Sequence, residues 1–286
     1  MALTTGCLLR SVDWFQLAFL AFPPLVLCYG SSHVHYQLKT LIWQVFLQCL
    51  GGVSMTAGYH RLWSHRSYQA SRPLKYILAA FGASTCQWSI MWWVRHHRAH
   101  HRYVDTDRDP YNAKRGLFYS HIGWLLINGE HTWGKVDLSD LKQDPIVVWQ
   151  QRYYVVIAAF TGLILPVSIA HFGWDDLRGG FVYATCFRLV WTWHITFCIN
   201  SLAHWAGTQP FSTRSSARNN WLLGFVSFGE GWHNFHHAFP YDYRNGVHWY
   251  QADITKWCIW IWEKIGLAKN LRRIDSHPKI KSRIMR

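Results

Sequence analysis

The chain has 286 residues, which fits one or two domains, and it carries 29 Lys and Arg against 15 Asp and Glu, a net charge of +14. Aromatic residues make up 17% of the sequence and 18 residues are histidine, a composition that suits a protein at a membrane interface. The seven cysteines are odd in number and include no C-x-x-C pair, which argues against a disulfide framework and for buried thiols in a reducing compartment.

Four apolar segments are long enough to cross a bilayer, which takes about 17 to 25 residues. They are residues 13–30, 40–58, 153–171 and 181–201. The first contains Pro23 and Pro24, which a membrane helix tolerates with a kink, and it lacks a cleavage site after it, so we expect it to remain as the first span. A fifth apolar stretch, residues 76–94, is more polar and is predicted to form one buried or interfacial helix.

Basic residues are unevenly distributed along the chain. Most lie in residues 59–152 and after residue 201, whereas the connections 31–39 and 172–180 hold one each. By the positive-inside rule, the chain ends and the large middle segment face the cytosol, and two short hairpins lie on the far side. Topology and anionic lipid then explain the positive charge. Nucleic acid binding is not expected of a chain with four membrane spans.

Eight histidines fall into three short clusters, and two of these share the spacing H-x-x-H-H. The clusters are His60 and His65; His97, His100 and His101; and His233, His236 and His237. On a helix, positions i, i+3 and i+4 share one face, so each triplet is predicted to direct three imidazoles toward one point. Isolated histidines such as His171 and His248 are interpreted as ordinary packed side chains.

The ligand type limits the chemistry of this site. Neutral imidazole suits Zn, Cu, Fe and Ni, but a structural zinc site needs only four ligands and usually recruits cysteine. The metalloprotease pattern H-E-x-x-H is absent. The pattern therefore predicts two metal ions with open coordination positions, and oxidation of a substrate would require iron or copper.

Longer motifs surround these histidines along nearly the whole chain. They are Gly58–Tyr68, His97–His101, Asp109-Pro110, Ser120–Trp124, Asn200–His204 and Gly229–His237. The set resembles the membrane-bound acyl-CoA desaturases, and the residues of its motifs are most similar to those of the stearoyl-CoA (Δ9) type of fungi and animals. H-x-x-H-H alone is shared with membrane hydroxylases, whereas the longer forms are much more specific.

The resemblance implies an all-α integral membrane protein with four transmembrane helices and a cytosolic helical cap that holds a histidine-rich dimetal centre. It implies a single desaturase domain over residues 1–286, and we expect no fused cytochrome b5 domain because no His-Pro-Gly-Gly haem signature is present.

The family's metal centre contains two iron ions (Fe2+) held by nine histidines. The resemblance therefore adds His204 to the eight clustered residues, and it assigns to Asn200 a contact with one iron through water. Carboxylates near the ligands are candidates for accepting hydrogen bonds that fix the imidazole tautomers. These are Asp105, Asp107, Asp109 and Glu230. The resemblance assigns no catalytic residue beyond the metal ligands.

In the resembling family the acyl chain lies in a bent apolar tunnel. Trp93 and Arg95 match residues at its mouth, where Arg95 is a candidate partner for the phosphates of CoA and a solvated arginine is the alternative. Residues near Gln48 and Gly52 are expected to close the tunnel and to set chain length.

Two departures from the animal pattern lie near the expected CoA mouth. His96 replaces an acid directly before the second histidine cluster, and Asn128-Gly129 replaces a basic pair. Both leave the head-group contacts, and the identity of the carrier, open. On a helix His96 lies 100° from His97, so we expect a surface residue and not a ligand.

The reaction implied is insertion of a cis double bond, at Δ9, into saturated acyl-CoA such as stearoyl- or palmitoyl-CoA. O2 is the co-substrate, and a separate cytochrome b5 with its NADH-cytochrome b5 reductase supplies two electrons. Basic residues could dock an acidic donor or contact lipid. They are Arg98, Arg102, Lys264, Arg272 and Arg273.

We expect a multi-pass protein of the endoplasmic reticulum membrane with both termini in the cytosol. The alternatives are the same oxidant with another outcome, such as Δ11 desaturation or hydroxylation, and a non-catalytic metal-binding membrane protein. The sequence leaves the double-bond position, the chain-length preference, the donor and the oligomeric state open.

Overall fold

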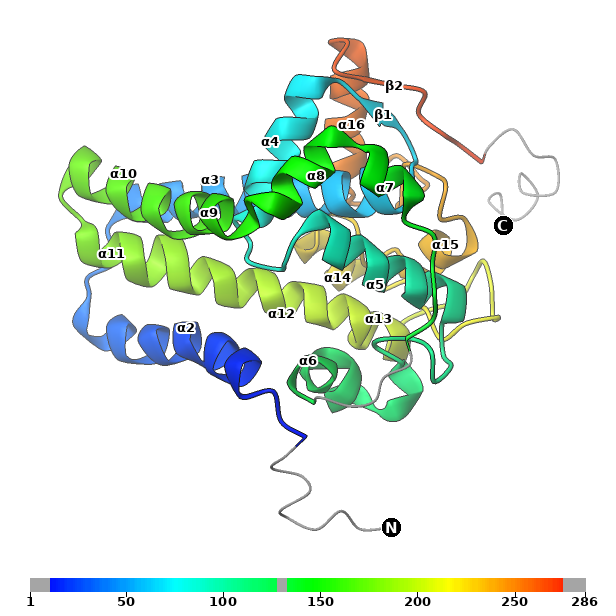
Figure 1. Ribbon diagram of the computed structural model, residues 1–286, viewed down its shortest axis with the longest axis horizontal. Helices are drawn as coiled ribbons and strands as arrows, with labels where there is room; N and C mark the ends of the chain where they lie inside the picture. The colour runs from blue at the N-terminus through cyan, green and yellow to red at the C-terminus, as the bar shows by residue number, and fades with distance from the viewer. Residues whose placement is uncertain (1–10, 128–132, 275–286) are drawn as a thin grey trace.

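The computed structural model describes residues 11–127 and 133–274, and these are mostly helical (Figure 1). Long apolar helices form one end of the molecule. They are α2 (Trp14–His33); α3 (Leu38–Val53), which continues into the π-helix η1 (Ser54–Ser64); α9, η4 and α10 (Tyr154–Ala159, Phe160–Ile164, Leu165–Trp174); and α11, η5 and α12 (Leu177–Phe181, Val182–Phe187, Arg188–Asn200). α2 runs through Pro23 and Pro24 as one helix.

Three of these helical runs are long and apolar enough to cross a membrane. They are Trp14–His33, Leu38–Ser64 and Tyr154–Trp174. The fourth predicted span also folds as a continuous helix, Leu177–Asn200, but Arg188 and His194 lower its mean hydropathy and it does not qualify on the same terms.

The stretch 76–94 does not form the single helix that its apolar composition predicted. α4 (Arg72–Ala83) ends within this stretch, and α5 (Ile90–Tyr103) begins within it. Between them, Cys86 and Trp88 adopt positive φ angles of 54° and 68°, which a helix cannot accommodate. Ser89 then caps α5, because its side chain accepts a hydrogen bond from the backbone N–H of Trp92 at 3.3 Å.

Shorter elements form the other end of the molecule. They are η2 (Ala113–Arg115), η3 (Tyr119–Gly123), α6 (Trp124–Leu126), α7 (Ser139–Gln143), α8 (Pro145–Arg152), α13 (Leu202–Trp205), α14 (Trp221–Val226), α15 (His233–Ala238) and α16 (Ile254–Lys264). Strands β1 (Gln69–Ala70) and β2 (Ala268–Lys269) pair antiparallel, with Gln69 opposite Lys269. This pair ties the segment after α16 to the segment after η1.

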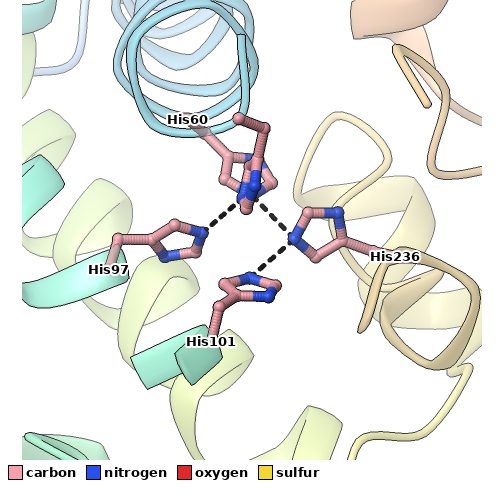
Figure 2. A group of neighbouring side chains, drawn as sticks. His60, His97, His101 and His236 are labelled. Atoms are coloured by element: carbon pink, nitrogen blue, oxygen red, sulfur yellow. Dashed lines mark hydrogen bonds between the residues drawn. The ribbon is translucent and has the colours of Figure 1, made fainter. Parts of the chain in front are cut away.

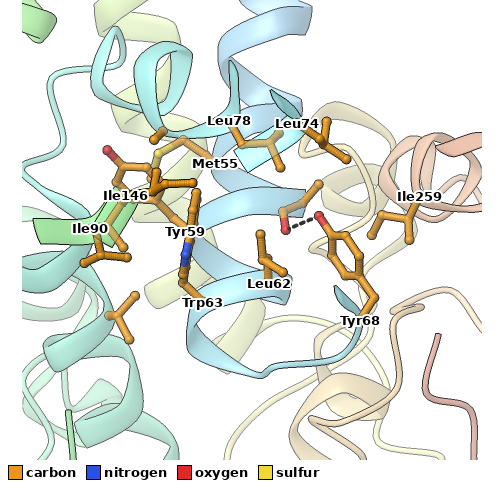
Figure 3. Packing of buried hydrophobic residues seen from close by; sticks show 14 of the residues in the cluster. Met55, Tyr59, Leu62, Trp63, Tyr68, Leu74, Leu78, Ile90, Ile146 and Ile259 are labelled. Carbon is orange, nitrogen blue, oxygen red and sulfur yellow. Dashed lines mark hydrogen bonds between the residues drawn. The ribbon is translucent and has the colours of Figure 1, made fainter. Parts of the chain in front are cut away.

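The main hydrophobic core lies around η1 (Figure 3). Tyr59, Leu62 and Trp63 project from η1, Leu78 comes from α4 and Ile259 from α16, and all are buried. Each buried aliphatic side chain contributes about 1.5–3 kcal/mol relative to an exposed one. Packing on several sides therefore holds η1 in place, and η1 carries the first histidine cluster.

The six described cysteines are free. Cys186 is buried, but Cys28 and Cys49 are exposed, so the prediction of buried thiols is wrong for these two. Both lie on helices that are long and apolar enough to cross a membrane, where an exposed side chain would face lipid.

Candidate metal centre

The structure gathers nine histidines into two neighbouring groups. One contains His60, His65, His97, His101 and His236, and the other contains His100, His204, His233 and His237. Within each group the ring nitrogens all lie within 4.8 Å of one another. These are the nine positions expected from the sequence, brought together from η1, α5, α13 and α15.

The π-helical turn explains how the first cluster works. His60 and His65 are five residues apart, a spacing that separates them by 140° on an ordinary α-helix. Here the backbone N–H of His65 donates to the carbonyl of His60 at 3.2 Å, an i→i+5 bond of the π type. The wider turn brings both rings to one side, with centroids 4.7 Å apart.

Each H-x-x-H-H triplet is divided between the two groups, so the prediction that each triplet aims at one point is wrong. Residues i and i+4 lie 40° apart on a helix, whereas i+3 lies 60° away on the other side. Thus His97 and His101 join the five-histidine group while His100 joins the four-histidine group. In α15 the same spacing applies with the groups exchanged. His233 and His237 join the four-histidine group, and His236 joins the five-histidine group.

In the five-histidine group the Nε2 atoms converge (Figure 2). Nε2 of His236 lies 3.0 Å from Nε2 of His60 and 2.9 Å from Nε2 of His101. The Nε2 atoms of His65 and His97 are 2.8 Å apart. α5 supplies two of the rings, η1 and its end two, and α15 the fifth, so the group is assembled from segments far apart in the chain.

The four-histidine group converges in the same way. Nε2 of His233 lies 3.0 Å from Nε2 of both His204 and His237, and Nε2 of His100 lies 3.3 Å from that of His237. Two neutral imidazoles can share only one N–H between facing nitrogens. A cation at the centre of each group satisfies every facing lone pair, so the donor sets fit imidazole-bound metal ions.

Acidic side chains contact the opposite ring nitrogens. Nδ1 of His60 lies 2.7 Å from Oε2 of Glu230, and Nδ1 of His100 lies 2.9 Å from Oδ1 of Asp109. A carboxylate at Nδ1 holds the proton there and leaves Nε2 unprotonated for a metal. Both carboxylates were candidates from the sequence.

A third ligand is oriented indirectly. Nδ1 of His204 lies 2.8 Å from the hydroxyl of Ser216, whose backbone N–H donates to Asp105 at 2.7 Å. Ser216 had no signal in the sequence, because it lies in an irregular segment 12 residues beyond its histidine. Asp107 is exposed, and the structure gives it no place at the centre.

Burial favours the neutral form of seven of the nine imidazoles. It lowers the pKa of His65, His97 and His101 well below the ordinary value, and neighbouring histidines lower each pKa further. The same causes lower the pKa of His233 to about 3. Burial alone would raise the pKa of Glu230, but His60 and Arg61 bring it to about 2. Imidazoles with an unprotonated Nε2 and ionised carboxylates are the forms that support metal binding.

An apolar cavity lies beside both groups. Gln48, Gly52 and Trp93 line it, and so does Asn200 at the end of α12. Its other lining residues include Met55, Thr192, Ile195, Ile199, Phe228, and four of the clustered histidines, His60, His97, His100 and His233. Arg95 is exposed on α5 and does not line this cavity.

Phe228 forms part of the cavity wall that sequence reasoning missed. Its φ is +60°, and Thr255 fixes its carbonyl with two hydrogen bonds, from N–H at 3.2 Å and from the hydroxyl at 2.8 Å. The ring lies against Gly52: a Cβ atom there would be 2.4 Å from Cε2 of Phe228. Any larger residue at position 52 would therefore force this ring to shift.

A second cavity adjoins the first. Trp93, His97, Thr196 and Asn200 line both. His96 lines the second cavity and is buried, so its prediction as a surface residue is wrong. Two tryptophans cover it: the centroid of the His96 ring lies 3.9 Å from that of Trp92 and 4.3 Å from that of Trp133. It belongs to neither histidine group, and Asn128-Gly129 lies outside the described residues.

The basic residues expected at the surface fall into two kinds. Arg98 is half-buried, where it pairs with Asp140 at 2.7 Å and donates to the carbonyl of Trp63, also at 2.7 Å. It is therefore not available for docking, because its guanidinium is used within the protein. The other four, Arg102, Lys264, Arg272 and Arg273, are exposed.

Comparisons with known proteins show which sequences this chain resembles. The family model described as fatty acid desaturase matches residues 40–264. A probable acyl-CoA desaturase of Schizosaccharomyces pombe is 48% identical over 92% of this chain and 55% of its own length. Acyl-CoA desaturase 1 of Saccharomyces cerevisiae is 43% identical over 94% and 53%, and stearoyl-CoA desaturase of Bos taurus is 35% identical over 96% and 77%. The chain thus spans about half the length of the two yeast relatives.

Proposed function

The chain belongs to the fatty acid desaturase family, and from that premise we propose that it inserts a cis double bond, at Δ9, into saturated acyl-CoA such as stearoyl- or palmitoyl-CoA. One observation carries the proposal: an apolar cavity opens onto histidines of both groups. A flexible hydrocarbon chain in that cavity would lie against the metal centre. The names of the relatives support the acyl-CoA substrate and the Δ9 position.

The nine histidines are proposed to hold two iron ions, five on one and four on the other. Bound iron, with O2 and two electrons from outside, supplies the oxidising power that an unactivated methylene requires. Glu230 and Asp109 keep Nε2 of two ligands free of protons. Asn200 lies beside the cavity at the centre and is proposed to reach one iron through water.

The protein's own task is to place one carbon of the chain and to exclude water from it. Trp93 and Asn200 line both cavities, so they are positioned to direct the chain from one to the other. Gln48 and Gly52 line the same cavity as Phe228, where they would limit the length of the acyl chain. Arg95, exposed two residues after Trp93, is proposed to bind the phosphates of CoA.

We propose that Leu177–Asn200 is a fourth membrane span, that the protein resides in the endoplasmic reticulum, and that both ends face the cytosol. The histidine-bearing end then forms a cytosolic cap. Cytochrome b5 and its NADH-linked reductase are the proposed electron source. The exposed Arg102, Lys264, Arg272 and Arg273 would favour an acidic donor.

The test is complementation of yeast that lacks its own Δ9 desaturase, without added oleate, followed by gas chromatography and mass spectrometry of the lipids. Growth with Δ9 16:1 and 18:1 is the expected result. A Δ11 bond or a hydroxyl group would assign the same centre to another reaction. Absence of any new product, with expression and iron content confirmed, would contradict the proposal.

A further inference from the structure

A buried arginine connects the metal centre to the C-terminal part of the described chain. Arg61 follows the ligand His60 in η1 and is 1% exposed. Its guanidinium donates to Oε1 of Glu230 at 3.0 Å and to both oxygens of Asp253, at 2.9 and 3.1 Å. The other oxygen of Glu230 is the atom 2.7 Å from Nδ1 of His60. A continuous chain of contacts therefore runs from Asp253 to a metal ligand.

Several hydrogen-bond donors hold the carboxylate of Asp253 in place. It is fully buried, and its carboxylate accepts hydrogen bonds from the backbone N–H groups of Asn245, Gly246 and Lys256, at 2.8 to 3.0 Å. The last of these bonds caps α16. The side-chain amide of Asn245 also donates to Oε2 of Glu230 at 2.7 Å. The loop before α16 thus fixes both carboxylates.

We propose that Arg61 and Asp253 are positioning residues for the metal ligand His60. Asp253, fixed by backbone donors, orients the Arg61 guanidinium, which orients Glu230, which in turn sets the plane and the tautomer of the imidazole. The inference rests on the proposed metal centre but not on its reaction. Carboxylates that contact a metal ligand tune metal affinity. Here the position of that carboxylate, Glu230, depends on Asp253 through Arg61.

A purely structural role is the alternative, because a buried ion pair also joins η1 to α16. Arg188 provides a matched control for it. This second fully buried arginine donates to the backbone carbonyls of Ala184, Ser84 and Gly162, at 2.9 to 3.1 Å, and none of these three residues belongs to either histidine group. Replacing either arginine perturbs a buried guanidinium, but only Arg61 leads to a metal ligand.

The experiment compares Asp253→Asn, Arg61→Lys and Arg188→Lys with the full wild-type chain in detergent. Metal equivalents per folded protein and the rate of metal release to a chelator are measured on the monodisperse fraction. Asp253→Asn and Arg61→Lys are expected to weaken metal binding about 10- to 100-fold and to lose up to one of two equivalents. Arg188→Lys is expected to retain both.

The inference would be overturned if Asp253→Asn and Arg61→Lys both kept the metal content and the metal-release rate of the wild type. Equal metal loss in Arg188→Lys would overturn it as well. If Asp253→Asn yields no folded protein, Arg61→Lys, which keeps the charge, gives the same comparison. The absorption spectrum of cobalt-loaded protein is a second readout: a changed ligand geometry should alter it in Arg61→Lys and Asp253→Asn but not in Arg188→Lys. A wild-type chain that binds no metal would instead overturn the proposed centre itself.

Discussion

The contact between Gly52 and Phe228 gives a single-residue test of the cavity wall. Gly52→Ala places a methyl group where the Phe228 ring now lies, so the ring must move into the cavity. We expect the ratio of 16:1 to 18:1 products to rise, by about tenfold, the scale on which a pocket discriminates a methylene. Equimolar palmitoyl- and stearoyl-CoA, with products measured by gas chromatography, provide the test.

Phe228→Val is the opposing variant, because it removes ring volume from the same wall. It should shift the products toward longer chains. An unchanged ratio in both variants, with activity retained, would show that this wall does not limit the substrate.

The division of each triplet between the groups predicts which ligand affects which metal. His100→Ala should empty the four-histidine group and His236→Ala the five-histidine group, so each variant should lose at least one metal equivalent and all turnover. Metal analysis of the purified proteins measures this. His96→Ala is the control: it removes a buried ring next to the same helix face, so we expect lower thermal stability with unaltered metal content. Full activity in either ligand variant would refute the assignment.

Among the helices, α4 supports the π-helix that carries His60 and His65. Leu78 is buried and packs against Gly58 of η1, where a Cβ would lie 3.1 Å from that of Leu78. Leu78→Ala should therefore reduce the free energy of unfolding by about 2–5 kcal/mol. Ile77 is 48% exposed on the same helix, so Ile77→Ala should cost much less. Thermal unfolding of both variants in one detergent measures the difference, and equal losses would contradict this role for Leu78.

Local pattern predicted some elements and missed others for identifiable reasons. Apolar runs located the long helices, because hydropathy depends on composition alone. Hydropathy could not locate the break between α4 and α5 at Cys86 and Trp88, because neither residue with a positive φ angle there is a glycine and no proline marks the break. The turn between His60 and His65 was also beyond a rule based on 3.6 residues per turn. His204 came only from family resemblance, and Ser216 and Phe228 depend on tertiary contacts that no spacing encodes.

At the scale of the whole molecule, the two short hairpins lie together at the end opposite the histidines (Figure 1). The hydroxyl of Thr40, at the start of α3, contacts Asp176, which caps α11, and Trp174 donates to the same hydroxyl at 2.9 Å. Both connections therefore lie on one side of the helical bundle. With the basic residues concentrated at the histidine end, the positive-inside rule supports the proposal that the hairpins face the lumen.

Glycosylation mapping tests this topology. A flexible insertion carrying Asn-Gly-Thr after Asp175, which is exposed, should be glycosylated in endoplasmic reticulum membranes, because it would extend from the hairpin that is proposed to face the lumen. The same insertion at Gly116 is the control: this glycine has a φ of 104°, no described atom lies within 4 Å of the position that a Cβ would take there, and the residue lies at the histidine end. We expect no sugar there. A glycosidase-sensitive shift of the Gly116 protein, and none of the Asp175 protein, would invert the orientation and place the metal centre in the lumen, away from a cytosolic electron donor.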